Sequence, residues 1–364
     1  MKEHELVSTI LGRLSTLLSQ VPSVCSVDPQ PEALGGEAGR ADGILTVSLE
    51  GSTVHTLVVE AKGNAQPRNV RDAARRLTTL VEELRSGGVP HPSAILGAPY
   101  VSERSAAVLA EHGVGHLDLA GNARLAFGPV YVERSGHANP HAVDRPFSSL
   151  FAPKTSRVAR ALLAHPSRVW RLQELADEVD VSLGLVAKAK ASLLNGEYAR
   201  DSPDGLVLAD PEGLLDAWLV ADRRRPKPRG YYSLDSIPET ERRIAAAADE
   251  IGVRAALTAF SGAERVAPHV RYTHASILIE ADALTEVGER AGLRPVETGA
   301  NVRLHEPYDD GAFYGAQDID GVPVAHPVQL ILDLAREKGR GEEAADFLLR
   351  HALAPTWSDL HRSP

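Results

Sequence analysis

Residues 172–208 read LQELADEVDVSLGLVAKAKASLLNGEYARDSPDGLVL, and this stretch decides the fold of the middle of the chain. Its first residues carry an apolar stripe with the three- and four-residue spacing of a helix that buries one face. The stripe consists of Leu172, Leu175, Ala176 and Val179. Ser182 is a good N-cap for a further helix, which Asn195-Gly196 would end. The stretch therefore predicts two consecutive short helices.

A third helix is expected before this stretch, at Lys154–His165, and a hairpin is expected at its end. The strands of the hairpin are predicted at Tyr198–Arg200 and Leu206–Leu208, joined by the Asp204-Gly205 turn. Three helices followed by a hairpin are the arrangement of a winged helix-turn-helix. We place this domain at residues 151–222.

The last of the three helices has the composition of a helix that enters a DNA groove. No acidic residue occurs between Val181 and Asn195. The helical repeat places Val186, Ala189 and Leu193 on the buried face. The opposite face holds Gly184, Ala187, Lys188, Ala191 and Asn195. Small residues would let the backbone approach the groove, and Lys188 could reach phosphate or guanine. Duplex DNA is the expected partner.

Further side chains of this module could contact DNA phosphates or help the helix to dock. The full set of expected DNA-binding residues is Arg157, Arg168, Arg171, Ser182, Lys188, Lys190 and Arg200. The alternative is that the module binds protein, as some winged helices do. The Arg- and Pro-rich connector at Arg223–Arg229 could be a solvated linker as well as a DNA contact.

Charge and composition limit the classes of protein that the chain could represent. The formal net charge is −10, which argues against a protein that coats nucleic acid over its whole surface. Between Lys154 and Arg229, however, 13 Lys and Arg residues stand against 11 Asp and Glu residues. Cys25 is the only cysteine, and no apolar run is long enough to span a bilayer. These features suggest a cytoplasmic, prokaryotic-type protein.

The first 150 residues are expected to form an α/β domain. A helical pattern opens the chain, and strands are predicted at Gly43–Leu49 and Thr53–Glu60. A long helix near Arg68–Arg85 follows, and then an apolar strand at Ala94–Gly97. Helices alternating with strands indicate an α/β layer architecture.

Asp42 precedes the first of these strands, and the second one ends in Glu60-Ala61-Lys62. An acid, a hairpin and then Glu-x-Lys resemble the motif of the PD-(D/E)xK nuclease superfamily, although Ala41 rather than proline precedes Asp42. The resemblance covers roughly residues 1–135 and implies a restriction-endonuclease-like α/β/α fold. Because side chains alternate along a strand, Glu60 and Lys62 should lie on one face.

The resemblance implies a catalytic set of Asp42, Glu60 and Lys62. The two carboxylates would bind Mg²⁺ or Mn²⁺, and Glu5 on the first helix could add a third. The metal would activate water for phosphodiester hydrolysis, and Lys62 would orient that water or stabilise negative charge. The alternative is that Glu60 and Lys62 form a solvent-facing pair. A second polar cluster contains Asp118 and Asn122, which would line the same cleft or cap a tight turn.

The final region, residues 230–364, is expected to form another α/β domain. Two parts of the chain, Gly315–Leu334 in this region and the winged helix before it, resemble a known family, and the resemblance extends over roughly residues 154–350. They are similar to AbiEi-type regulators, the antitoxin and autorepressor component of type IV toxin–antitoxin systems. That resemblance implies a cognate toxin as partner. Antitoxins of the family usually start at the winged helix, so the first 150 residues depart from its pattern.

The same resemblance implies a nucleotidyltransferase-like fold for the C-terminal domain. Leu257–Gly262 would be the remnant of its Gly-Ser turn, and Ser276-Ile277-Leu278 the strand that carries metal carboxylates in active enzymes. Those carboxylates are absent, so we expect binding or dimerisation rather than nucleotidyl transfer. The histidines of this region do not fall at metal-ligand spacings.

Three functions are compatible with the sequence. The first is a DNA-binding transcriptional regulator, antitoxin-like or defence-associated, with a nuclease-like N-terminal domain. The second is a Mg²⁺-dependent DNA endonuclease that its winged helix targets. The third is a non-catalytic scaffold for protein contacts. A homodimer is compatible with all three, and no membrane partner is expected.

Overall fold

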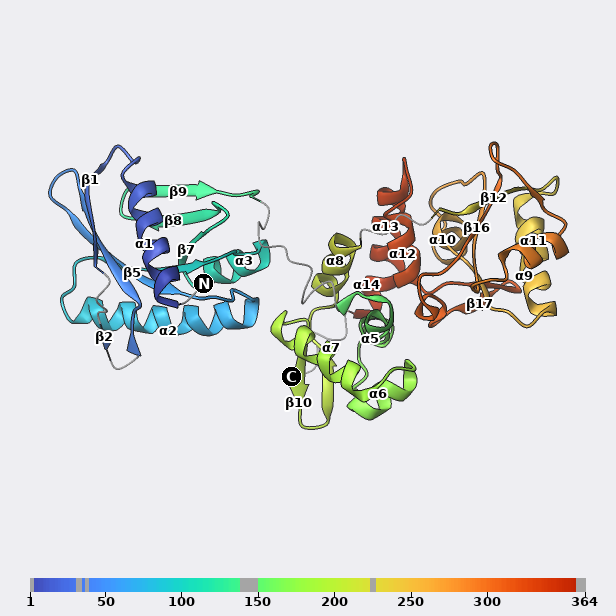
Figure 1. The fold of residues 1–364 in the computed structure, drawn as a ribbon, viewed down its shortest axis with the longest axis horizontal. Coiled ribbons are helices and arrows are strands. Elements are labelled where there is room, and N and C mark those ends of the chain that lie inside the picture. Colours follow the sequence, from blue (N-terminus) through green and yellow to red (C-terminus); the bar gives the residue numbers. More distant parts are fainter. Residues whose placement is uncertain (1–2, 31–34, 37–38, 138–149, 223–226, 358–364) are drawn as a thin grey trace. The chain divides into compact units, whose positions relative to one another are not determined.

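The computed structural model describes residues 3–30, 35–36, 39–137, 150–222 and 227–357 (Figure 1). The chain divides into two compact units, Met1–Val143 and Asp144–Pro364. The arginines at the start of the connector, residues 223–225, lie outside the described residues. No helix among the described residues is long and apolar enough to cross a membrane.

The first unit is built on a mixed sheet with the described strand order β1-β4-β5-β6-β7-β8-β9. Its strands are β1 Val24–Gln30, β4 Gly43–Leu49, β5 Val54–Ala61, β6 Pro92–Ala98, β7 Gly115–Asp118, β8 Ala123–Phe127 and β9 Val130–Arg134. A two-stranded ribbon of β2 Gly35–Gly36 and β3 Gly39–Arg40 is separate. Neighbours pair antiparallel except along β5-β6-β7, where the pairing is parallel. Each parallel step crosses over through a helix.

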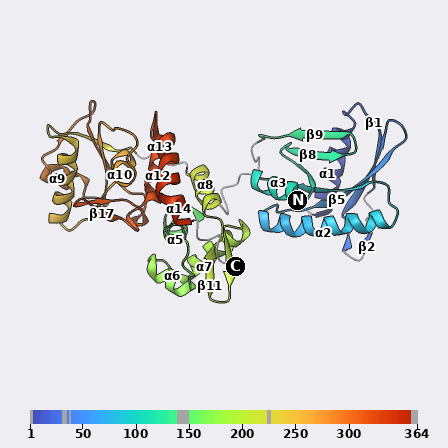
Figure 2. The same cartoon turned by 180° about the vertical axis from the view of Figure 1, so that it is seen from behind.

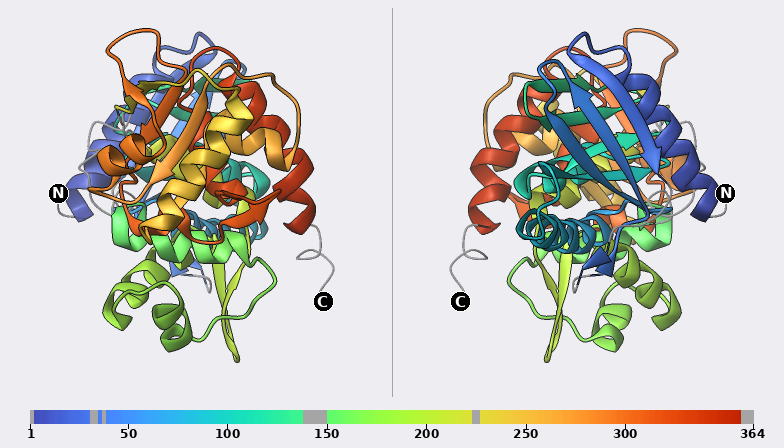
Figure 3. Two further views of the ribbon diagram at one scale, coloured as in Figure 1. Left: turned by 90° about the vertical axis from the view of Figure 1, so that its right-hand side faces the viewer. Right: turned by 90° about the vertical axis from the view of Figure 1, so that its left-hand side faces the viewer.

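Helices cover both faces of this sheet, as the views from behind and along the long axis show (Figures 2 and 3). They are α1 Glu3–Leu18 on one face, and α2 Pro67–Ser86 and α3 Glu103–Glu111 on the other. Alternation along β5 sends Leu57 and Val59 into the α1 core and Val58 into the α2 core. A Cβ on Gly97 of β6 would lie 2.5 Å from the side chain of Ile10, so glycine is what lets α1 approach the sheet.

The second unit begins with three helices and a hairpin, which we call the central module (residues 150–222). Its elements are α5 Pro153–Ala164, α6 Leu172–Glu178, α7 Leu183–Asn195, β10 Ala199–Ser202, β11 Gly205–Leu208 and α8 Pro211–Ala221. A bridge between Trp170 and Leu206 adds the chain before α6 to the hairpin. Gly205 has φ +148° and lies against the Trp170 backbone, where a Cβ would be 2.5 Å from the carbonyl oxygen. Glycine is therefore required at this turn.

The rest of the second unit is a mixed sheet with helices, which we call the C-terminal domain (residues 227–357). The described strand order is β15-β12-β16-β14-β13-β18-β17. The strands are β12 Arg229–Tyr232, β13 Ala255–Leu257, β14 Ala275–Ile279, β15 Arg294–Pro295, β16 Val302–His305, β17 Gln317–Ile319 and β18 Val322–Val324. The helices are α9 Ile237–Glu250, α10 Ala259–Val266, α11 Leu284–Arg290, α12 Pro327–Leu334, α13 Gly341–Leu348 and α14 Ala354–Trp357, with a 3₁₀ turn at Asp310–Phe313 and a π turn at Leu349–Leu353.

One hydrophobic core runs through both the central module and the C-terminal domain. Polar contacts reinforce it: the guanidinium of Arg160 donates to Gln329 at 2.8 Å, and the indole nitrogen of Trp357 donates to the Leu163 carbonyl at 3.4 Å. Arg160 has no exposed surface. The two parts were predicted as separate domains, and their shared core explains why they form one compact unit.

Candidate nucleic-acid interface and carboxylate cluster

Helix α7 has the start, the end and the faces that its sequence predicts. The Ser182 hydroxyl accepts a hydrogen bond from the Leu185 amide at 3.3 Å, which caps the first turn. The helix ends at Asn195. Its buried residues are Val186, Ala189 and Leu193. The exposed side holds Gly184, Ala187, Lys188 and Ala191, with Asn195 half-buried beside them. The surface of α7 that faces solvent is therefore free of acidic side chains.

Lys188, Arg171 and Arg200 are exposed basic residues among the expected DNA contacts. Lys188 lies on α7, Arg171 precedes α6, and Arg200 lies on β10 of the hairpin. Lys190 is less available, because its ammonium group pairs with Asp201 of β10 at 2.5 Å. This ion pair joins α7 to the hairpin. Ser182 is exposed, and its hydroxyl keeps a proton to donate while it caps the helix.

Arg168 is engaged within the module. Its guanidinium lies 3.8 Å from the centre of the Trp170 ring, pairs with Glu174 and lies 3.7 Å from Glu178. The hydrogen bond to Glu174 is the largest cause of a pKa of Arg168 above its ordinary value. A DNA phosphate would have to compete with two carboxylates for this side chain.

Arg157 is not a surface residue, which corrects its expected role as a phosphate contact. It lies within α5 with 9% of its side chain exposed, and it forms a bidentate pair with Asp309 of the C-terminal domain at 2.6 and 2.8 Å. The same guanidinium donates to the carbonyls of Val179 and Asp180. Burial tends to raise the pKa of Asp309, but the hydrogen bonds from Arg157 and the Gly311 amide lower it below its ordinary value. Arg157 therefore joins two parts of the protein.

The acids and the lysine of the N-terminal pattern gather at one end of β5. The Asp42 carboxylate accepts a hydrogen bond from the Ala61 amide at 2.8 Å. Glu60 is 2% exposed, and its carboxylate lies 2.7 Å from the ammonium of Lys62. The alternation of the strand thus places Glu60 and Lys62 on one face, and Glu60 is buried rather than facing solvent.

We call the group of Asp42, Glu60 and Lys62 the carboxylate cluster. Arg76 of α2 also belongs to it, and the sequence did not indicate this residue. Its guanidinium pairs with Glu60. The hydrogen bond to Glu60 is the main cause of its raised pKa, and the charges of Glu60 and Asp42 add to it. Two cations therefore contact the Glu60 carboxylate, and both acids act on one guanidinium. Arg76 is exposed and lies beside the buried stripe of α2, so the sequence contains no signal that singles it out as a partner of Glu60.

A third carboxylate does not join the cluster. Among the residues that the structure describes, no group of three or more His, Cys, Asp or Glu side chains could hold a metal ion. Glu5 is exposed on α1. Of the expected metal ligands, Asp42 and Glu60 lie at the end of β5, and Lys62 and Arg76 pair with the Glu60 carboxylate there.

The second polar cluster of the first unit is a capped turn. Asp118 has no exposed surface, and its carboxylate accepts hydrogen bonds from the amides of Gly121 and Asn122 at 2.8 and 2.9 Å. It also accepts from the Asn122 side chain at 2.8 Å and from the Val101 amide at 3.1 Å. Of the two predicted roles for Asp118, the structure shows the capping of a tight turn.

In the C-terminal domain, the segment expected as a degenerate Gly-Ser turn leads from β13 into α10. Ala259 has φ +47°, the left-handed region that favours glycine, at the first residue of α10. The Thr258 hydroxyl donates to Asp333 at 2.6 Å, and the Ser261 hydroxyl accepts from the Ser276 amide at 2.8 Å. Strand β14, ASILI, carries no carboxylate.

The architecture is that of a multidomain mixed α/β protein, with a solvent-facing helix surface free of acids in its central module. Residues 207–354 match the family described as transcriptional regulator, AbiEi antitoxin, type IV TA system. The predicted AbiEi-type resemblance is therefore confirmed for this segment, which begins in β11 and includes α8 and nearly all of the described C-terminal domain. No match was found among curated proteins or solved structures.

Proposed function

We propose that this protein is a DNA-binding regulator whose central module is a winged helix that docks α7 in the major groove of duplex DNA. One observation supports this above all: the exposed residues of α7 are Lys188, the small residues Gly184, Ala187 and Ala191, and Leu183 in the first turn, without an acidic group. A helix fits the major groove when its backbone can come close to the base edges. Gly184, Ala187 and Ala191 leave room for that approach.

The positions of the exposed cations support the same proposal. Lys188 would reach a phosphate or a guanine from the middle of α7. Arg171 and Arg200 would contact the flanking backbone from the start of α6 and from the hairpin, which fixes register and adds affinity without reading sequence. The N-terminus of α7, at Ser182, would offer its amides and its dipole to a further phosphate.

The family match supports regulation rather than a purely architectural role. The family to which residues 207–354 are matched is described as one of antitoxins and transcriptional regulators. We therefore propose a cognate toxin, in addition to operator DNA, as a partner of this chain. The first unit lies outside the matched segment, so it adds a feature that the family description does not cover.

The experiment is a titration of labelled random duplexes with the full-length protein at several salt concentrations. Binding should weaken linearly in log–log form as salt rises, because phosphate contacts release counterions. Lys188→Glu should weaken binding by about tenfold or more. Lys338→Glu makes the same charge change at an exposed site of the C-terminal domain and should have little effect. No binding at low salt by the folded wild type would overturn the proposal.

A metal-dependent endonuclease is the second candidate function. The observation in its favour is that Asp42, Glu60 and Lys62 meet at the end of β5, as the nuclease pattern requires. Asp42 and Glu60 would hold Mg²⁺ or Mn²⁺, which supplies an activated water for phosphodiester hydrolysis. The contact of Arg76 with Glu60 argues against this, since the guanidinium would have to move aside for the ion.

Incubation of supercoiled DNA with the full-length protein and Mg²⁺ or Mn²⁺ tests this second function. An active nuclease should nick the plasmid, and Glu60→Gln and Lys62→Ala should each abolish nicking. Arg76→Gln should leave or increase it, because that change removes a competitor for Glu60. Absence of nicking with both metals would leave Asp42 and Glu60 as structural acids. The outcome does not affect the DNA-binding proposal, which rests on α7.

A further inference from the structure

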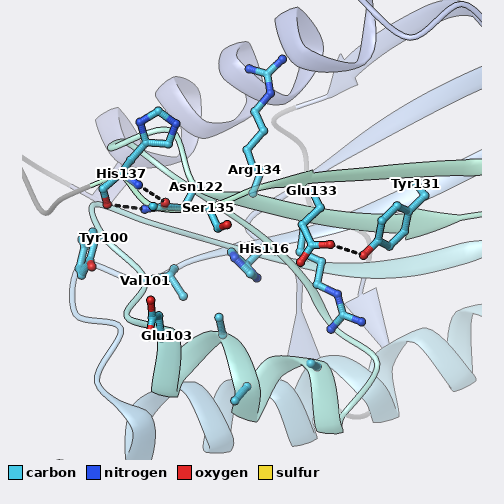
Figure 4. Close-up of a pocket in the computed structure, with 16 residues that line it drawn as sticks. Tyr100, Val101, Glu103, His116, Asn122, Tyr131, Glu133, Arg134, Ser135 and His137 are labelled. Atoms are coloured by element: carbon cyan, nitrogen blue, oxygen red, sulfur yellow. Dashed lines mark hydrogen bonds between the residues drawn. The ribbon is translucent and has the colours of Figure 1, made fainter. Parts of the chain in front are cut away.

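A cavity of about 420 Å³ lies on the α3 side of the first unit, between that helix and strands β7, β8 and β9 (Figure 4). It is distinct from the carboxylate cluster, because none of Asp42, Glu60 and Lys62 lines it. A volume of this size accommodates a small organic molecule.

Two walls of the cavity are fixed by the turn that Asp118 caps. Asp118 holds the Val101 amide, which positions the wall on the side of Tyr100. Asn122 accepts from the His137 amide at 3.0 Å and donates to the His137 carbonyl at 3.1 Å, as Figure 4 shows. The polar cluster that stood out in the sequence therefore frames a preformed pocket.

His116 is a buried polar residue that lines the cavity. The residue is 6% exposed, and its ring lies among the lining residues in Figure 4. Its Nδ1 atom is buried and has no hydrogen-bond partner among the described residues. Burial, more than any charge, lowers the pKa of His116, which favours the neutral imidazole. A buried nitrogen without a partner is costly, and a ligand that hydrogen-bonds to it would remove that cost.

The remaining surfaces favour a flat ring. Ala106, Ala107 and Ala110 of α3 line one side with small side chains, which leaves a smooth apolar wall. Tyr100 and Tyr131 lie toward opposite ends of the cavity in Figure 4, and Tyr131 is 61% exposed. Planar ligands stack on aromatic side chains and pack against flat apolar surfaces.

The charged groups around the cavity favour a ligand that carries amino groups. Glu103 and Glu133 line it, and Glu133 already accepts from the Tyr131 hydroxyl at 2.5 Å. Arg124 and Arg134 also line the cavity, and Arg134 donates one hydrogen bond to Gln20, outside the lining, at 3.2 Å. Carboxylates accept hydrogen bonds from exocyclic amines, and this is how proteins read cytosine.

We infer that this cavity binds an amino-bearing nucleobase, either of a free nucleoside or nucleotide or of an unpaired nucleotide in a DNA strand. The ring would lie on the alanine wall, with the two tyrosines toward its ends, and would hydrogen-bond to His116 Nδ1. Its exocyclic amine would donate to a carboxylate at the rim. The inference does not depend on α7, since the cavity belongs to the first unit alone.

Calorimetric titration of the full-length protein with deoxyadenosine, deoxycytidine, deoxyguanosine and thymidine tests the inference. At least one amino-bearing nucleoside should bind, and thymidine should bind about tenfold more weakly or worse, because it has no exocyclic amine. Parallel titrations with the corresponding monophosphate and with a short single strand identify the source of the base. Tighter binding of the strand than of the monophosphate assigns the site to unpaired DNA, and the reverse assigns it to a free nucleotide.

Two variants connect binding to the cavity. Ala107→Leu should fill it and weaken binding by about tenfold or more, while Ala126→Leu, an equal change at an exposed position of β8 outside the cavity, should not. His116→Phe replaces the imidazole with a planar ring that has no nitrogen, and it should also weaken binding by about tenfold. Circular dichroism checks that each variant is folded. The inference is wrong if none of the nucleosides, monophosphates or strands binds the wild type at millimolar concentration, or if Ala107→Leu binds as the wild type does.

Discussion

At the scale of single residues, Arg157 and Lys188 show how far side-chain type predicts function. Both are basic residues of the central module, and the sequence assigns both to DNA. Lys188 is exposed on α7, whereas Arg157 is buried against Asp309, which lies 152 residues further along the chain. The difference is a matter of tertiary packing, which periodicity within one helix does not contain.

The buried ion pair leads to the first prediction. Arg157→Ala would leave the Asp309 carboxylate, 6% exposed, without its cation. Removal of one partner of a buried pair costs about 3–5 kcal/mol of unfolding free energy. Urea unfolding should show this loss.

The control is Arg171→Ala, which removes an exposed arginine of the same module and should leave the urea midpoint unchanged. If Arg157→Ala instead weakened DNA binding at unchanged stability, the original assignment of this residue to DNA would hold.

Two buried histidines predict the response of the second unit to acid. Burial lowers the pKa of His305 and of His326 to about 4, below the value of 6.5 for an unfolded chain. The unfolded state therefore binds more protons, so stability is complete above about pH 6.5 and declines as the pH falls toward 4. Each histidine contributes up to about 3 kcal/mol to this decline.

His326→Asn tests this pH dependence. The His326 ring nitrogen Nδ1 accepts from the Val328 amide at 3.3 Å, and asparagine can cap a helix in the same way without titrating. The loss of stability between pH 6.5 and 4.5, measured by urea unfolding, should be smaller in the variant than in the wild type. An equal loss in both proteins would show that other groups govern acid unfolding.

At the scale of elements, helices with a strong apolar stripe were predicted almost to the residue. The helix expected at Arg68–Arg85 is α2, Pro67–Ser86, and the capped helix after Ser182 is α7. Strand β1 escaped prediction because it is an edge strand, exposed along most of its length, and contains Pro29. Strand β8 also escaped prediction, because its alternation of buried and exposed residues extends over only 5 residues.

The contacts of the carboxylate cluster were likewise predicted only in part. Alternation along β5 predicted that Glu60 and Lys62 share a face, and they form an ion pair. Arg76 could not be predicted, because its contact depends on how α2 is rotated against the sheet. The alternation of residues within a strand determines on which face a side chain lies. The packing of helices against the sheet determines which charged residue it contacts.

The link between α7 and the hairpin leads to a prediction on affinity. Asp201 of β10 holds Lys190 and adds a negative charge near the proposed DNA surface. Asp201→Asn should free the lysine and strengthen DNA binding by about two- to tenfold, with a salt dependence steeper by about one contact. Fluorescence anisotropy at several salt concentrations measures both quantities.

Asp204→Asn is the matched control for this change. Asp204 is an exposed acid at the turn of the same hairpin, so its loss removes one charge without releasing Lys190. Its effect should be smaller than that of Asp201→Asn. Weaker binding by Asp201→Asn would mean that the ion pair positions the hairpin for DNA and that its rigidity matters more than its charge.

At the scale of the whole molecule, charge and cores are distributed unevenly. The chain carries a net charge of −10, yet its central stretch from Lys154 to Arg229 has a basic excess. One core joins the central module to the C-terminal domain, while the first unit has two cores of its own, one on each face of its sheet. The central module therefore shares one hydrophobic core with the segment that matches the antitoxin family.

The shared core predicts how the chain unfolds. The two compact units should give two calorimetric transitions, because each has its own hydrophobic interior. Leu193→Ala in α7 and Leu330→Ala in α12 truncate fully buried side chains of one core. Both should lower the temperature of the same transition, and each should cost about 2–5 kcal/mol of unfolding free energy. Leu77→Ala in α2 should lower the other transition alone. If Leu193→Ala produced a third transition whose temperature Leu330→Ala did not change, the central module would be an independent domain. A ligand of the C-terminal domain could then affect DNA binding only through the connector.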